Sequence, residues 1–129
     1  PYHGVRIEYW EFPQLMQYPV GGHYQPHIDA EYLYYDTNPA GEWRRIADRD
    51  FSLIWCLNED FSGGRLVFPD HELAVKPNSG TVIIFPSNHF YGQGVAPDVR
   101  GERFTIVSWL AAAGTPRVTR QRPPHIRAR

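Results

Sequence analysis

The sequence predicts an all-β fold of the jelly-roll or barrel kind, with little helix. Three observations support this prediction. The 129 residues include 12 Pro and 11 Gly, which divide the chain into short segments. Between these breaks lie roughly eight short runs that alternate apolar and polar residues or are continuously apolar. Apolar repeats at the helical period of 3.6 residues are nearly absent. Short strands at this spacing are typical of a two-sheet antiparallel jelly roll or barrel.

In the first half of the chain, each expected strand is bounded by turn-forming residues. Residues 5–9 alternate apolar and charged side chains, and residues 15–18 resume an extended pattern. Residues 23–30 follow a Gly-Gly turn and form a polar, aromatic strand. Residues 32–35 are aromatic and extend that strand, whereas the polar residues 42–49 are expected to form a short helix or a loop.

The second half of the chain continues the pattern of short strands and turns. Residues 51–57 are apolar except for Ser52, which predicts a strand that is buried on both faces or lies at the centre of a sheet. Turns are expected at residues 59–64 and 97–101 because of their composition. The other expected strands are residues 65–68, 73–75, 81–85, 93–95 and 102–110.

Length and composition indicate one soluble domain. The chain is 42% hydrophobic, with four Trp, eight Tyr and seven Phe to fill a core. No apolar run approaches the roughly 18 residues of a membrane span, and no signal-peptide pattern opens the chain. The single cysteine, Cys56, excludes an internal disulfide and is expected to be a small buried hydrophobe. A reducing compartment, and hence a cytoplasmic location, fits best.

Charge divides the chain into a predicted domain, residues 1–116, and an Arg-rich tail, residues 117–129. The basic residues of the tail are Arg117, Arg120, Arg122, Arg127 and Arg129, and no acidic residue accompanies them. Removing these five from the 13 basic residues leaves 8 against 14 acidic ones, so residues 1–116 have a formal net charge of −6. The tail is expected to be solvated, or to dock on an acidic partner, on nucleic acid or on its own domain.

The motif His27-Ile28-Asp29 carries the clearest chemical signal. Side chains two residues apart on a strand leave the same face, so this imidazole and this carboxylate would converge on one point. They are two of the three ligands in the facial set that holds non-haem ferrous iron with open positions. A hydrogen-bonded surface pair has the same short sequence, so the assignment depends on the rest of the chain.

Four further blocks follow one another in a recognisable order: MQYPVGGHYQPHIDA, RDFSLIWCLNEDFSGGRLVF, VKPNSGTVIIFPSN and GVAPDVRGERFTIVSWL. With them, the chain from about residue 14 to residue 110 resembles the 2-oxoglutarate- and iron(II)-dependent oxygenases of the prolyl 4-hydroxylase-like group. The blocks match the family's tyrosine and His-x-Asp, its buried strand and Gly-Gly hairpin, the strand leading to the third ligand, and the final Gly-x-Arg strands. The resemblance implies a double-stranded β-helix, which is a jelly roll.

Carried over residue by residue, the resemblance makes His27 and Asp29 iron ligands. It implies that Arg103 pairs with the distal carboxylate of 2-oxoglutarate, to which a guanidinium offers a bidentate fork. The alternative for Arg103 is a surface position on an edge strand. Tyr18 resembles the tyrosine whose hydroxyl reaches the cosubstrate, and its alternative is a core aromatic with a satisfied hydroxyl. Trp109 shares the inward face of the last strand and is expected to wall the same pocket.

The residue at the position of the third metal ligand differs from the histidine of the family. Its place, a histidine four residues before Pro97 and ten before Arg103, is taken by Gln93. A glutamine offers a neutral carbonyl oxygen, which is a weaker donor to ferrous iron than imidazole. Three interpretations stay open: Gln93 ligates weakly, His89 reaches the metal from its loop, or the site is degenerate and does no chemistry. An engineered substitution that disables the site would give the same sequence.

The resemblance also implies an activity, cofactors and partners. Fe(II) and 2-oxoglutarate would be required, ascorbate could assist, and 2-oxoglutarate would be converted to succinate while a prolyl-type residue of a peptide or protein is hydroxylated. Residues 32–35 and 37–43 are expected at the mouth of the site, because loops on a rigid barrel carry recognition. A homo-oligomer or an acidic partner, bound through the Arg tail, is a further expectation.

Three other functions can be compared with the sequence, and the first of them agrees with it best. A catalytically degenerate binding or structural module would use the Arg tail as a tether, and Gln93 favours it. A nucleic-acid demethylase of the same superfamily usually has a second Arg six residues after the first, where this chain has Trp109. A cupin would need His-x-His, a Glu and a later His, which are not found. The sequence therefore argues against nucleic acid, and it predicts no membrane association.

Overall fold

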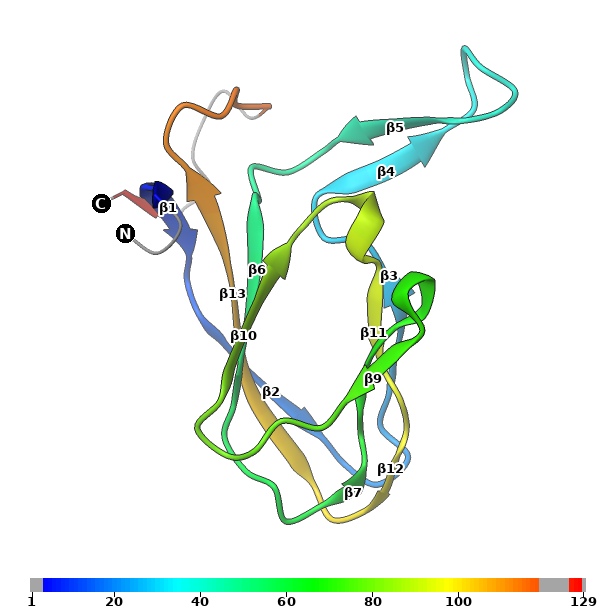
Figure 1. Ribbon diagram of the computed structural model, residues 1–129, viewed down its shortest axis with the longest axis vertical. Coiled ribbons are helices and arrows are strands. Elements are labelled where there is room, and N and C mark those ends of the chain that lie inside the picture. The colour runs from blue at the N-terminus through cyan, green and yellow to red at the C-terminus, as the bar shows by residue number, and fades with distance from the viewer. Residues whose placement is uncertain (1–3, 119–125, 129) are drawn as a thin grey trace.

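The computed structural model describes residues 4–118 and 126–128 of the chain. Within these residues it contains fourteen strands and two 3-10 turns but no α-helix. The strands form two facing layers joined by short turns (Figure 1), which confirms the predicted jelly roll with little helix. None of the described helical turns has the length or apolar character needed to cross a membrane.

The larger sheet is built around its longest strand, β13. Its strands are β1 (Ile7–Glu11), β2 (Gln14–Tyr18), β6 (Phe51–Cys56), β10 (Val82–Pro86), β13 (Arg103–Ala112) and β14 (Ile126–Ala128). On one side β13 pairs with β6, which in turn pairs with β10. On the other side its first half pairs with β2 and its second half with β1, which also pairs with β14. All of these pairings are antiparallel, so side chains of β2, β6 and β13 that face inward stand in register.

The facing sheet has the strand order β3-β11-β8-β9. Its strands are β3 (Tyr24–His27), β8 (Leu66–Phe68), β9 (Leu73–Val75) and β11 (Gln93–Val95). Two ribbons lie at opposite ends of the layers (Figure 1): β7 (Ser62–Gly63) with β12 (Asp98–Arg100), and β4 (Glu31–Tyr34) with β5 (Glu42–Arg45). The 3-10 turns are η2 (Pro69–His71) and η3 (His89–Tyr91).

The β4–β5 hairpin corrects two expectations. The segment expected to be a short helix or a loop contains strand β5, and β4 is a separate strand, set off from β3 by a bend. Its pairing follows from cross-strand contacts that a one-chain pattern does not reveal. Arg44 donates to both carboxylate oxygens of Asp36 at 2.8 and 3.1 Å, and Glu31 stands opposite Arg45. The expected turns at 59–64 and 97–101 likewise contain the short strands β7 and β12.

The hydrophobic core lies between the two sheets. Its buried members are Ile54, Cys56, Leu66, Phe68 and Phe85. The expectation of a buried, unpaired Cys56 is thereby confirmed. Strand β6 lies at the centre of its sheet as predicted, but it is not buried on both faces, because alternate residues point outward and Trp55 is exposed.

Two isoleucines on opposite faces of the larger sheet allow a matched test of which face packs on the core. Ile54 is 8% exposed, whereas Ile84 on the neighbouring strand is 57% exposed. We expect Ile54→Ala to lower the free energy of unfolding by about 2–4 kcal/mol through lost burial and a cavity. We expect Ile84→Ala to change it by less than about 0.5–1 kcal/mol. Urea unfolding measures both, and equal losses would contradict the assignment of the inner face.

The start of the Arg-rich tail contacts its own domain. Arg117 Nη2 lies 2.6 Å from Glu8 Oε2 and donates to the carbonyl oxygen of Ala112 at 3.1 Å. The backbone of β14 continues the sheet beside β1. Three other arginines of the tail lie outside the described residues, so their expected roles stay predictions: Arg120, Arg122 and Arg129. The boundary at residue 116 and the tether role stay predictions.

Candidate metal site

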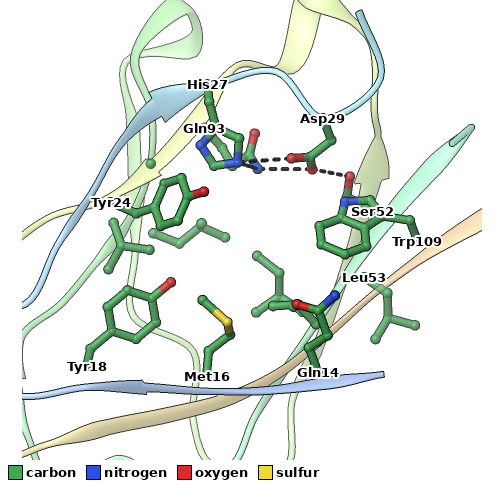
Figure 2. A pocket seen from close by; sticks show the side chains of 15 residues that line it. Gln14, Met16, Tyr18, Tyr24, His27, Asp29, Ser52, Leu53, Gln93 and Trp109 are labelled. Carbon is green, nitrogen blue, oxygen red and sulfur yellow. Dashed lines mark hydrogen bonds and ion pairs between the residues drawn. The ribbon is translucent and has the colours of Figure 1, made fainter. Parts of the chain in front are cut away.

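The imidazole of His27 and the carboxylate of Asp29 meet between the two sheets (Figure 2), with His27 Nε2 3.0 Å from Asp29 Oδ1. His27 ends β3 and Asp29 lies in the following bend, so the bend aligns the pair, and the expected strand alternation does not. His27 Nδ1 lies 3.0 Å from the carbonyl oxygen of Gln25. Because a carbonyl only accepts, Nδ1 carries the proton of the neutral ring, which leaves the Nε2 lone pair to bind a cation. In the protonated ring, Nε2–H donates to Asp29 Oδ1 instead.

The third position of the site is occupied by the side-chain amide of Gln93. Strands β11 and β3 are paired so that Gln93 stands opposite His27. Gln93 Nε2 lies 3.1 Å from Asp29 Oδ2 and 3.2 Å from His27 Nε2. Its carbonyl oxygen, Oε1, is buried and has no hydrogen-bond partner. The structure therefore brings together the three residues that the sequence places in the ligand set.

The spacing of His27 and Asp29 fits one small cation. Ligand atoms about 2.1 Å from an octahedral ion lie about 3 Å from one another, which matches the 3.0 Å between His27 Nε2 and Asp29 Oδ1. The amide nitrogen of Gln93 lies beside both residues. Half a turn of the Gln93 amide would direct Oε1 toward His27 and Asp29. One imidazole nitrogen, one carboxylate oxygen and one amide oxygen would then surround the ion. With the amide as placed, its N–H groups instead donate to both partners.

Two serines behind the site were missed in the sequence. Ser52 Oγ donates to Asp29 Oδ2 at 2.5 Å and lies 2.8 Å from Ser87 Oγ, and both serines are buried. Ser52 contacts the oxygen of Asp29 that does not face His27 and so fixes the orientation of the carboxylate, while Ser87 holds the Ser52 hydroxyl. The available signal was that Ser52 is the only polar residue in an apolar strand.

Hydrogen bonding and burial shift the pKa values of the two titratable side chains. The hydrogen bond to Asp29 raises the pKa of His27 above its ordinary value, against the opposing effect of burial. Burial alone would raise the pKa of Asp29. Hydrogen bonds from His27, Ser52 and Trp109 outweigh it and hold that pKa below its ordinary value. The carboxylate is therefore ionised, and protons compete with a cation for His27 Nε2.

In the absence of metal, this pair is expected to stabilise the fold most between about pH 4 and pH 6.5. The raised pKa of His27 gives stability that is complete below its unfolded-state pKa and is lost as pH rises through the folded-state value. The lowered pKa of Asp29 gives stability that is complete above its unfolded-state pKa and is lost as pH falls through the folded-state value. Urea unfolding with a chelator, at about pH 5.5 and about pH 8.5, should show His27→Asn losing less stability at the higher pH. An equal loss at both values would argue against the coupling.

An inner cavity of about 130 Å³ lies next to the three side chains. Tyr18 and Trp109 line it at opposite ends (Figure 2). Trp109 lies beside Asp29, and the guanidinium carbon of Arg49 is 3.9 Å from its ring centroid. The sequence placed Trp109 in the same wall as Arg103. The two are six residues apart on one strand, about 20 Å when extended; Trp109 lines the inner cavity together with Tyr18, and its role toward the cosubstrate stays a prediction.

Arg103 is buried, at 2% exposure, and does not occupy the alternative surface position. Its guanidinium carbon is 5.0 Å from the ring centroid of Tyr18, directly across from it on β2. It does not line the inner cavity, because Tyr18 lies between. Burial raises the pKa of the nearby Asp98 carboxyl, an effect that Arg103 opposes. Gly64, at a φ of 58°, allows Asp98 to approach, since a Cβ there would collide with its carboxylate.

His89 is not placed to act as a metal ligand. Its Nδ1 lies 2.5 Å from Glu31 Oε2, and its ring stacks on Trp43 at the base of the hairpin. In the part of the chain that the structure describes, no group of three or more His, Cys, Asp and Glu side chains converges on a metal position. The amide of Gln93 hydrogen-bonds to both members of the His27–Asp29 pair.

Comparison with known proteins identifies the family. Residues 13–111 match the family model described as the 2OG-Fe(II) oxygenase superfamily. The chain belongs to this superfamily. Among curated members, it is 29% identical over 91 residues to the prolyl 4-hydroxylase subunit alpha-2 of Gallus gallus, a match that covers 70% of this chain and 16% of that protein. It is 33% identical over 98 residues to a PKHD-type hydroxylase of Maricaulis maris, covering 74% and 40%.

Two solved prolyl hydroxylase structures share the fold. The 2-oxoglutarate complex of a viral collagen prolyl hydroxylase from Paramecium Bursaria Chlorella virus-1 superposes with a TM-score of 0.65 at 23% identity, covering 84% of this chain and 62% of that one. A Pseudomonas putida prolyl-4-hydroxylase gives a TM-score of 0.58 at 26% identity, covering 85% and 55%. The chain thus spans less than half of these curated relatives and under two thirds of these solved chains.

Proposed function

We propose that this chain is the core of a 2-oxoglutarate- and Fe(II)-dependent dioxygenase that hydroxylates a prolyl-type residue in a peptide or protein. The observation that carries the proposal is the convergence of His27, Asp29 and Gln93 to within 3.2 Å beside the inner cavity. The names of the relatives, prolyl 4-hydroxylase and PKHD-type hydroxylase, support the reaction class.

Each part of the site has a role in this proposal. His27, Asp29 and the turned amide of Gln93 would hold the metal, with Ser52 fixing the carboxylate. Bound ferrous iron and 2-oxoglutarate supply the oxidising power for hydroxylation of an unactivated C–H bond. Arg103 and Tyr18 would bind the distal carboxylate of 2-oxoglutarate. The apolar side chains that line the inner cavity would limit the access of water to the reacting atoms.

The test is turnover by the purified protein with ferrous iron, 2-oxoglutarate, ascorbate and a proline-containing peptide. The expected results are succinate formation and a peptide mass increased by one oxygen atom, both absent when iron is chelated. His27→Ala serves as the control that removes one ligand. Turnover that persists in His27→Ala, or none in the native protein with metal bound, would contradict the proposal.

The arrangement of Gln93 favours a second candidate, a catalytically degenerate binding module. As placed, the amide donates to both His27 and Asp29 and satisfies the pair without a cation. A native protein that binds neither iron nor 2-oxoglutarate, measured by calorimetry, would support this candidate. In this candidate the Arg tail would tether the module to a partner, so the double variant Arg120→Gln/Arg122→Gln should weaken partner association. The double variant is preferable to deletion of the tail, because the deletion would also remove the Arg117–Glu8 contact.

We also infer a cytoplasmic location. The support is that Cys56 is buried and unpaired, which suits a reducing compartment. Fractionation of cells that express the tagged protein measures it, and recovery in an oxidising compartment would overturn it.

A further inference from the structure

A second hollow lies outside the layers, at the end where the β4–β5 hairpin projects (Figure 1). It has a volume of about 620 Å³ and is bounded by the hairpin, the end of β3 and the turns η2 and η3. We call it the outer groove. His27 lines both the outer groove and the inner cavity. A chain bound in the groove would therefore lie directly beside the candidate metal site.

One wall of the outer groove is held in a fixed position. Glu31 Oε2 accepts a hydrogen bond from the backbone N–H of His89 at 2.7 Å and lies 2.5 Å from its Nδ1. The Trp43 ring stacks on the His89 imidazole, with centroids 4.9 Å apart and planes 3° apart. Glu31 and Trp43 belong to the two strands of the hairpin, and His89 belongs to η3. These contacts fasten the hairpin to the sandwich, so the groove has a defined shape.

The lining of the outer groove is aromatic and acidic. Tyr32 and Tyr35 are 60% and 62% exposed, and Trp43 is exposed beside them. The carboxylates of Glu31 and Asp70 also line the groove, whereas no Lys or Arg does. Among the described residues, Asp70 has no side-chain hydrogen bond or ion pair. Exposed aromatic faces next to a free carboxylate attract a guanidinium or an ammonium group.

We propose that the outer groove binds a peptide segment in which an arginine or lysine flanks the residue presented at His27. Asp70 provides the ion pair, and the rings of Tyr32, Tyr35 and Trp43 provide the cation–π faces. The groove and the inner cavity share His27, which places the basic side chain outside while the neighbouring residue faces the site. The inference rests on the proposed function only in taking this peptide to be the substrate.

The experiment uses two proline-containing peptides that differ only in the residue after the proline, arginine or glutamine. Binding is measured by Trp fluorescence and calorimetry with the native full chain, without iron or 2-oxoglutarate. We expect the arginine peptide to bind about tenfold more tightly, the combined effect of one exposed cation–π contact and one exposed ion pair. The preference should fall as ionic strength rises. Equal affinity for the two peptides would overturn the proposal.

Two variants locate the preference. Asp70→Asn is expected to reduce it to about threefold, because the ion pair is lost and the aromatic contact is kept. Glu72→Gln removes the same charge two residues away, outside the groove lining, and should leave the preference unchanged. An unchanged preference in Asp70→Asn, or an equal loss in both variants, would refute the assignment to this groove.

Failure of this inference and failure of the proposed function give different results. An arginine preference in binding without any turnover would contradict the dioxygenase proposal and support peptide binding in the outer groove. Turnover of both peptides at equal efficiency and equal affinity would support the dioxygenase proposal and contradict the arginine preference of the groove. Tyr35→Ala, on an exposed side chain, offers a second check, since it should weaken arginine-peptide binding by a few-fold without changing thermal unfolding.

Discussion

Replacement of Gln93 by histidine is expected to raise the affinity for Fe(II) by on the order of 10–100-fold, the range seen when metal-site partners are exchanged. Imidazole is the stronger donor to ferrous iron, and the register of β11 with β3 already directs this position at His27. The substitution also removes an amide N–H that lies 3.1 Å from Asp29 Oδ2. Anaerobic titration with Fe(II), followed by Trp fluorescence, measures the affinity, and succinate formation should rise with it.

Gln93→Ala is the matched control for this prediction. If Oε1 ligates in the native protein, the alanine variant should bind Fe(II) more weakly than the native protein, while the histidine variant binds it more tightly. Equal affinity of the alanine variant and the native protein would show that the amide is no ligand. An unchanged affinity in Gln93→His would contradict the placement of position 93 in the metal site.

Replacement of Arg103 by glutamine is expected to weaken 2-oxoglutarate binding by about 2–5 kcal/mol, the cost of truncating one partner of a buried charge pair. That range corresponds to a roughly 30-fold to several-thousand-fold higher dissociation constant. The guanidinium is almost fully buried next to Tyr18, so a carboxylate that reaches it is shielded from solvent. Calorimetry measures the affinity, and in an active protein KM for 2-oxoglutarate should rise more than kcat falls.

Arg100→Gln, on an exposed residue of β12, removes the same charge elsewhere and should leave 2-oxoglutarate binding unchanged. Thermal unfolding of Arg103→Gln separates loss of binding from loss of fold, because Asp98 is buried nearby. A folded Arg103→Gln protein with native affinity for 2-oxoglutarate would exclude Arg103 from the cosubstrate site. Tyr18→Phe tests the hydroxyl separately, since it keeps the ring next to the guanidinium.

The sequence predicted those features that depend on local spacing. The His27–Asp29 spacing, together with the order of the four blocks, predicted that these side chains and Gln93 lie together, although a bend and not strand alternation aligns the pair. The alternation in β2, β6 and β13 predicted the inward faces, including the buried Arg103. These faces were predictable because strand period is a property of neighbouring residues, whereas the roles of the residues toward a metal and 2-oxoglutarate stay predictions.

Features that depend on packing between distant segments were not predictable. Strand β5 has a polar sequence and forms because β4 offers it backbone partners and because Asp36, just beyond β4, pairs with Arg44. Ser52 has a role only because the bend at Asp29 directs a carboxylate oxygen at it. Alternation gave the inward face of Trp109, which lines the inner cavity, but not its distance along the strand from Arg103. The sequence placed residues 32–35 and 37–43 at the mouth of the site, but it did not predict the contacts of the hairpin with η3 that shape the outer groove.

Strand β13 pairs with three different neighbours along its length, and this has a consequence for how the protein can change. Adding or deleting one amino acid within β13 would turn Arg103 or Trp109 outward and break several ladders together. The tip of the β4–β5 hairpin lies beyond the paired strands, so an insertion there breaks no ladder of the two layers. We therefore expect substrate preference to change through insertions at the tip, whereas an insertion in β13 would disrupt the whole candidate site at once.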